Sequence, residues 1–81
     1  MTDAVEAAAR YAARRFGSAR AEPKITQFYT TDGWQPMTEG PTRLSVGAAQ
    51  ELRSRGIFMV RVRHRLRTFE VKLLHYLGFN D

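Results

Sequence analysis

The chain has 81 residues, no cysteine and a formal net charge of +5 at pH 7. This length fits one small domain with a thin core, and the missing cysteines exclude a disulfide framework and a thiolate metal site. No apolar run approaches the roughly 18 residues of a membrane span, and Asp3 and Glu6 stand where a signal peptide carries positive charge. We therefore expect a single soluble, cytoplasmic domain over residues 1–81.

The first predicted element is a helix from Asp3 to Phe16. Asp3 is a suitable N-cap, apolar residues recur at helical spacing, and Gly17 is placed to end the helix. Most of these apolar residues are alanines, so the helix brings little apolar area to a core. Residues 18–23 follow as a short polar linker.

A β-hairpin is expected next. Residues 25–31 are rich in β-branched and aromatic residues, which favours a strand. Asp32-Gly33 is a strong signal for a type I′ turn, after which residues 34–37 form a short returning strand. Pro36 cannot donate to a central ladder, so this strand should lie at the edge of its sheet. Residues 38–42 are then expected to form a loop.

The second half of the chain begins with a helix over residues 46–55, capped by Ser45 and ended by Gly56, and a strand over residues 57–65 follows. Apolar residues between 68 and 77 alternate as in a strand but fit helical spacing equally well. We favour a helix over 68–77, with a strand as the alternative, because residues 66–68 lack the Gly or Asn of a tight hairpin. The sequence thus predicts a small α+β domain: helix, β-hairpin, helix, arginine-rich strand, then helix or strand.

The most informative stretch is an alternating row of four arginines, Arg61, Arg63, Arg65 and Arg67. In a strand all four would point to one face, spaced roughly 6.6 Å apart. A row of always-charged, planar guanidinium groups indicates an acidic partner. The alternative is a solvated outer face of a small sheet. Arginine makes up 11 of the 13 basic residues, which a GC-rich genome also explains, but codon usage does not explain the alternation.

No catalytic motif is present. The serines have no nucleophile-elbow setting, there is no glycine-rich phosphate loop, and the eight acidic residues are scattered. His64 and His75 are the only histidines, and the sequence offers no further ligands beside them that would complete a zinc site. We expect a non-enzymatic protein without cofactor, metal or small-molecule substrate.

The predicted function is binding of an acidic partner, either nucleic acid or a protein complex that handles nucleic acid. Aromatic side chains could add stacking, although in so small a domain we expect Trp34 to be a core anchor rather than an exposed stacking residue. The alternative is a phage or mobile-element inhibitor, similar to anti-CRISPR proteins, that blocks a host nucleoprotein machine by protein–protein contact; this analogy rests on size, charge and missing catalytic residues. The predicted binding residues are Arg53, Arg55, Arg61, Arg63, Arg65, Arg67, Lys72, Tyr29 and Trp34.

Overall fold

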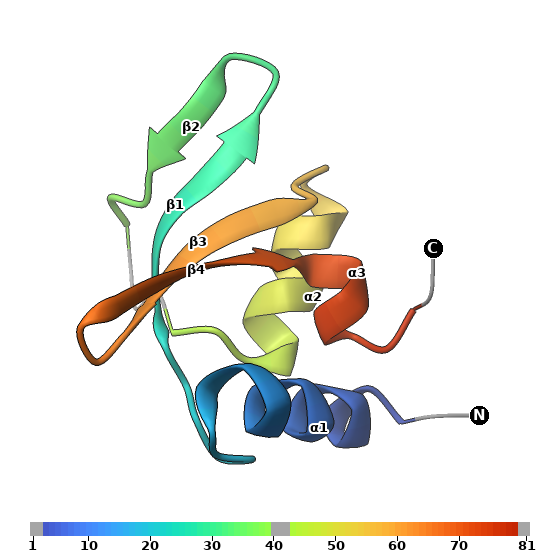
Figure 1. The fold of residues 1–81 in the computed structure, drawn as a ribbon. Coiled ribbons are helices and arrows are strands. Elements are labelled where there is room, and N and C mark those ends of the chain that lie inside the picture. Colours follow the sequence, from blue (N-terminus) through green and yellow to red (C-terminus); the bar gives the residue numbers. More distant parts are fainter. Residues whose placement is uncertain (1–2, 40–42, 80–81) are drawn as a thin grey trace.

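Seven elements make up the part of the chain that the computed structural model describes, residues 3–39 and 43–79. In chain order they are α1 (Ala4–Phe16), β1 (Lys24–Thr30), β2 (Gly33–Pro36), α2 (Val46–Ser54), β3 (Met59–His64), β4 (Arg67–Lys72) and α3 (Leu73–Tyr76) (Figure 1). The strands form one antiparallel sheet in the order β2-β1-β3-β4. The fold is a small α+β domain, as predicted.

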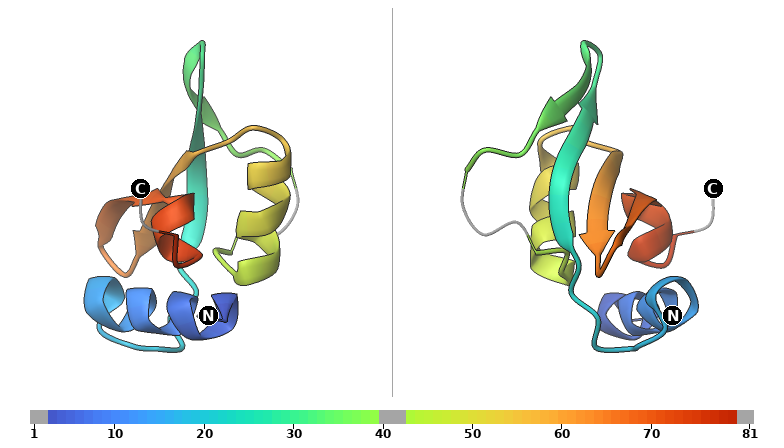
Figure 2. Two further views of the ribbon diagram at one scale, coloured as in Figure 1. Left: turned by 90° about the vertical axis from the view of Figure 1, so that its right-hand side faces the viewer. Right: turned by 60° about the vertical axis from the view of Figure 1, so that its left-hand side comes forward.

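The helices cover only one face of this sheet. When the left side of Figure 1 is turned forward, the strands lie in front and α2 lies behind them (Figure 2). Side-chain burial agrees, because residues of β3 and β4 alternate between the two faces, and β1 does so on either side of a bulge between Ile25 and Gln27. The residues buried on the covered face are Ile25, Val60, Val62 and Val71. No helix of the described residues lies over the other face of the sheet.

A single apolar core lies between the sheet and the helices. Leu44 and Leu73 are fully buried there, and Leu52 of α2 joins them. The alanine-rich helix α1 contributes through its two large residues, since the rings of Tyr11 and Phe16 pack edge to face with centroids 6.1 Å apart. None of the helices within residues 3–39 and 43–79 combines the length and the hydrophobicity that a membrane span requires.

Both predicted helix caps are confirmed. The Asp3 carboxylate accepts a hydrogen bond of 2.8 Å from the backbone N–H of Val5, and Gly17 ends α1 with a φ of +82°. The Ser45 hydroxyl accepts one of 3.2 Å from the N–H of Ala48 at the start of α2. These caps satisfy backbone donors that the first helical turn leaves without partners.

The predicted β-hairpin is present and β2 is an edge strand, but the turn type was wrong. Thr30 pairs with Gly33, and Gly33 has a φ of +97°, whereas Asp32 does not have a positive φ. A type I′ turn needs a positive φ at both central residues. Here the left-handed residue is Gly33, which follows the two residues of the bend. Of the loop predicted over residues 38–42, residues 40–42 lie outside the described residues.

The helix predicted over residues 68–77 is wrong for its first half. Residues 67–72 form β4, which pairs with β3, and only Leu73–Tyr76 are helical. The expectation failed because the β3–β4 turn has no glycine: Arg65 itself adopts the left-handed conformation, with a φ of +59°. The strand alternative was therefore correct up to Lys72.

Candidate binding surface on the open sheet face

The β3–β4 turn divides the predicted arginine row. His64 pairs with Arg67 across the turn, and residues paired across strands share one face of a sheet. Arg67 therefore lies on the face of His64, opposite to Arg61 and Arg63, while Arg65 sits in the turn. The prediction of four arginines on one face is wrong, because a two-residue turn moves odd-numbered residues to the other face.

The other predicted cations are also dispersed. Arg55 on α2 forms an ion pair of 3.5 Å with Glu51, one helical turn away. The Arg53 guanidinium lies 4.0 Å from the ring centroid of Phe58, on the helix side of the molecule. Lys72 is paired with Met59 at the far end of β3 and is on the open face. Arg53, Arg55 and Arg67 thus do not belong to the open sheet face.

The centre of the open face is organised by Arg61. Its guanidinium lies 3.9 Å from the ring centroid of Trp34. Its Nη1 donates to the Gln27 side-chain oxygen at 3.2 Å, and its Nε and Nη2 donate to one carboxylate oxygen of Glu70 at 3.3 and 3.2 Å. Arg61 is therefore held in one geometry, with its charge largely balanced by Glu70. We call Arg61, Trp34, Gln27 and Glu70 the central cluster.

Two aromatic residues lie side by side on this face. Tyr29 and Trp34 are partners across β1 and β2, with ring centroids 5.1 Å apart in an edge-to-face arrangement. Tyr29 is 49% exposed, and Trp34 is partly buried beneath Arg61. Trp34 is not part of the core between sheet and helices, so the core-anchor role that the sequence favoured for it is wrong.

Two cations of this face, Lys24 and Arg63, form no ion pair within the described residues, although the Arg63 Nε donates to the backbone oxygen of Arg65 at 3.4 Å. Arg63 is exposed and lies directly opposite Lys24 of β1, so two positive charges are neighbours. Like charges in this position repel each other, which favours a bound anion between them. Lys24 was not among the predicted residues. A bulge between Ile25 and Gln27 places it on the open face, and no sequence pattern indicates this bulge.

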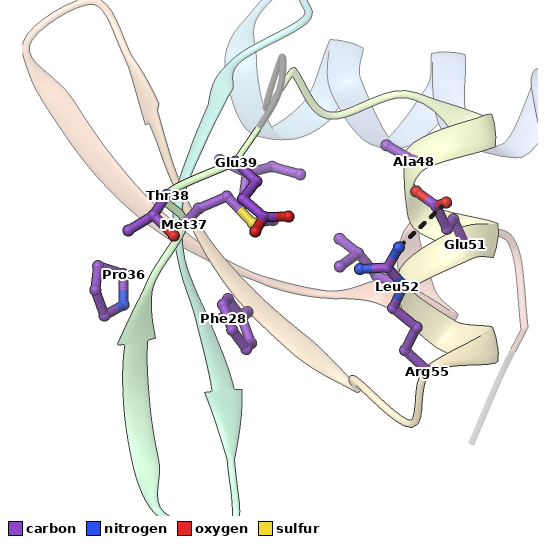
Figure 3. A pocket seen from close by; sticks show the side chains of 10 residues that line it. Phe28, Pro36, Met37, Thr38, Glu39, Ala48, Glu51, Leu52 and Arg55 are labelled. Atoms are coloured by element: carbon purple, nitrogen blue, oxygen red, sulfur yellow. Dashed lines mark ion pairs between the residues drawn. The ribbon is translucent and has the colours of Figure 1, made fainter.

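A hollow of about 600 Å³ lies between the β1–β2 hairpin and α2 (Figure 3). Phe28, Met37 and Leu52 give it apolar walls, and the Glu51–Arg55 ion pair lies at its edge. Among the described residues that line it there is no histidine, serine or lysine. No group of three or more His, Cys, Asp or Glu residues in the described ranges could hold a metal ion.

No protein-family model, no curated protein and no solved structure matches this chain. The open sheet face combines an exposed tyrosine, the Trp34–Arg61 stack and the adjacent pair Lys24 and Arg63.

Proposed function

We propose that the protein is a non-enzymatic binding protein that holds single-stranded nucleic acid, without sequence preference, across the open sheet face. The observation that carries this proposal is the exposed Tyr29 ring next to the Trp34–Arg61 stack, on the same face as Lys24 and Arg63, which form no ion pair with any described carboxylate. Aromatic rings that stack on bases, beside cations that contact phosphates, are the usual composition of single-strand binding surfaces.

The face is better suited to a single strand than to a duplex. Bases in a duplex are stacked inside the helix and cannot reach a ring on a flat sheet, whereas unpaired bases can turn toward it. The β1–β2 hairpin, which projects beyond the helices, has the two-stranded shape that fits a major groove (Figure 1). However, residues 25–37 contain no Lys or Arg and do contain Asp32, so the hairpin lacks cations for the phosphates on either side.

In the proposed complex each residue of the face has a separate role. Tyr29 stacks on a base, and Lys24 and Arg63 contact the phosphates that follow. Arg61 acts by positioning, because its hydrogen bonds to Gln27 and Glu70 fix the ring of Trp34 beneath it. Lys72 extends the cationic path along the end of β4.

The test is binding of labelled mixed-sequence single-stranded DNA and RNA, and of matching duplexes, measured by fluorescence anisotropy across a salt series. Contacts from Lys24, Arg63 and Lys72 predict a log–log salt slope of about −2, at roughly 0.7 per phosphate. The variant Lys24→Glu/Arg63→Glu should lose at least about tenfold in affinity.

The matched control is Arg10→Glu/Arg14→Glu, which makes the same change in net charge at two exposed positions of α1. It should bind almost as the wild type does. An equal loss in both variants, or no binding by the wild type at low salt, would contradict the proposed surface.

A second candidate function uses the same face differently. Arg, Trp and Tyr are the residues most enriched in the energetic centres of protein interfaces, and Arg61, Trp34 and Tyr29 form such a cluster. An inhibitor of the anti-CRISPR kind would press this cluster against an acidic, nucleic-acid-binding surface of its target. Such a protein ignores naked nucleic acid, so the anisotropy experiment separates the two functions.

A further inference from the structure

A second hollow lies on the helix side of the molecule, away from the open sheet face. Its volume is about 370 Å³, and it is formed where the start of α1, the outer side of α2 and the α3 region meet. Its apolar walls come from Leu74, Leu77 and Phe79. Phe79 is 61% exposed although it is a large apolar side chain.

Arg53 joins this hollow to a second exposed aromatic residue. It lines the hollow, and its guanidinium also lies 4.0 Å from the ring centroid of Phe58, which is 58% exposed. Single exposed apolar residues are ordinary, but two phenylalanines connected through one arginine and a hollow form a patch. We call Arg53, Phe58, Leu74 and Phe79 the helix-side patch.

The charge of Arg53 is not balanced within the described residues. Its Nη1 donates to the backbone oxygen of Ile57 at 3.3 Å, while its Nε is buried and has no hydrogen-bond partner. No carboxylate of the described ranges lies within 4.0 Å of its nitrogens, and none lines the hollow. A partly buried cation without an anion is costly, so a carboxylate brought to this point would gain strong, charge-assisted hydrogen bonds.

We infer that the helix-side patch is a docking site for an acidic amphipathic segment of a partner protein. An apolar side chain of that segment enters the hollow between Leu74 and Phe79, and a neighbouring carboxylate pairs with Arg53. Phe58 covers the other side of the guanidinium. The arrangement has the aromatic and arginine composition that dominates binding energy in protein interfaces.

Charge complementarity favours this occupant over two others. In a two-fold contact, a second copy of the chain would place its own Arg53 against the first one. It would also bring no carboxylate, because none lines the hollow. Nucleic acid would find apolar walls and a single cation. The patch lies on the opposite side from Lys24 and Arg63, so a partner protein could bind here while the sheet face is occupied.

The probe is a peptide of about 16 residues with Leu and Phe at helical i, i+3, i+4, i+7 spacing and Glu elsewhere. It is titrated into the isotopically labelled full chain and followed by NMR, where the Arg53 Nε–H gives its own signal. We expect saturable shifts at Arg53, Leu74 and Phe79. A version of the peptide with Gln in place of Glu should bind at least about tenfold more weakly.

Two variants make the test specific. Arg53→Gln should reduce affinity about tenfold or more, and Arg55→Gln, at an exposed position two residues away, should leave it unchanged. Shifts confined to the sheet face, equal binding of the Gln peptide, no shifts at all, or self-association through Phe79 would each overturn the inference. None of these outcomes depends on whether the sheet face binds nucleic acid.

Discussion

Arg61 lies over the ring of Trp34 at 3.9 Å and thereby joins β3 to β2, although β1 separates the two strands in the sheet. Its other partners are Gln27 on β1 and Glu70 on β4. One side chain therefore contacts residues from the three other strands. On a sheet face that no helix covers, this cluster replaces the packing that a helix layer would supply.

Removing the Arg61 side chain should loosen the edge hairpin. A cation–π contact at a partly exposed site contributes about 0.5–1 kcal/mol, and an exposed ion pair up to about 1 kcal/mol. We expect Arg61→Ala to lower the free energy of unfolding by about 1–2 kcal/mol in urea denaturation. Trp34 is the only tryptophan, so its emission should also move to longer wavelength.

Arg63→Ala is the control for this prediction, because Arg63 lies on the same face of the same strand and its guanidinium makes one long hydrogen bond of 3.4 Å to the backbone oxygen of Arg65 instead of a cation–π contact. It should change both stability and emission little. If the two alanine variants behave alike, the contact between Arg61 and Trp34 does not stabilise the sheet.

The β3–β4 turn offers a stabilising substitution. Arg65 has a φ of +59°, a conformation that costs a non-glycine residue roughly 1 kcal/mol. Arg65→Gly should relieve this strain and raise the melting temperature by several degrees, since about 1 kcal/mol corresponds to roughly 4–8 °C in a domain of this size. Leu66→Gly, at the neighbouring turn position without positive φ, should lower it instead. A lower melting temperature for Arg65→Gly would mean that the arginine side chain contributes more than its backbone costs.

The same turn explains which parts of the fold and site could be predicted from the sequence. Helix caps and the edge position of β2 follow from local rules at Asp3, Ser45 and Pro36, and these predictions are confirmed. The side of the sheet on which a side chain lies could not be predicted in this way, because it depends on the number of residues in every preceding turn and bulge. A left-handed arginine in the turn moved Arg67 to the other face of the sheet.

Contacts between side chains of different strands could not be predicted from the sequence either. Trp34 and Arg61 are 27 positions apart in the numbering, and neither residue indicates the other by spacing. Lys24 reaches Arg63 only because a bulge in β1 resets the alternation. The sequence therefore indicated basic and aromatic residues in the strands, but not which of them share a face or form ion pairs.

Two buried tyrosines should make the domain sensitive to alkaline pH. Burial raises the pKa of the Tyr76 phenol above its ordinary value of 10.0, and the nearby Glu22 carboxylate raises it further. Burial also raises the pKa of Tyr11, although Arg15 opposes the shift. Because the folded state favours the neutral phenol, the stabilisation is fully present below about pH 10 and is lost as the pH rises through the folded-state value.

Urea denaturation at a series of pH values from 8 to 11 measures this effect. Tyr76→Phe should reduce the loss of stability above about pH 10, because a phenylalanine cannot ionise. Tyr29→Phe, at the exposed tyrosine of the sheet face, is the control and should keep the wild-type pH dependence. An unchanged alkaline loss in Tyr76→Phe would show that other groups cause it.

The contact between α1 and the end of α3 provides the last prediction. Gly78 has a φ of +93°, and a Cβ atom built there would lie 2.6 Å from the Cβ of Ala7, which is buried on α1. Gly17 has a similar φ of +82° but open space around it. Substituting alanine at either position brings the left-handed strain of roughly 1 kcal/mol. Only Gly78→Ala adds overpacking, which costs typically a further 1–3 kcal/mol.

The free energy of unfolding, measured by thermal or urea denaturation, should therefore be lower for Gly78→Ala than for Gly17→Ala by about 1–3 kcal/mol. The difference isolates the close approach of Gly78 to Ala7, since the backbone strain is common to both variants. Gly78 also directly precedes Phe79, so the same substitution should displace the exposed ring and weaken acidic-peptide binding at the helix-side patch. Equal losses of stability in the two variants would mean that the chain end moves away from α1 at little cost, and the hollow beside Phe79 would then not be a preformed site.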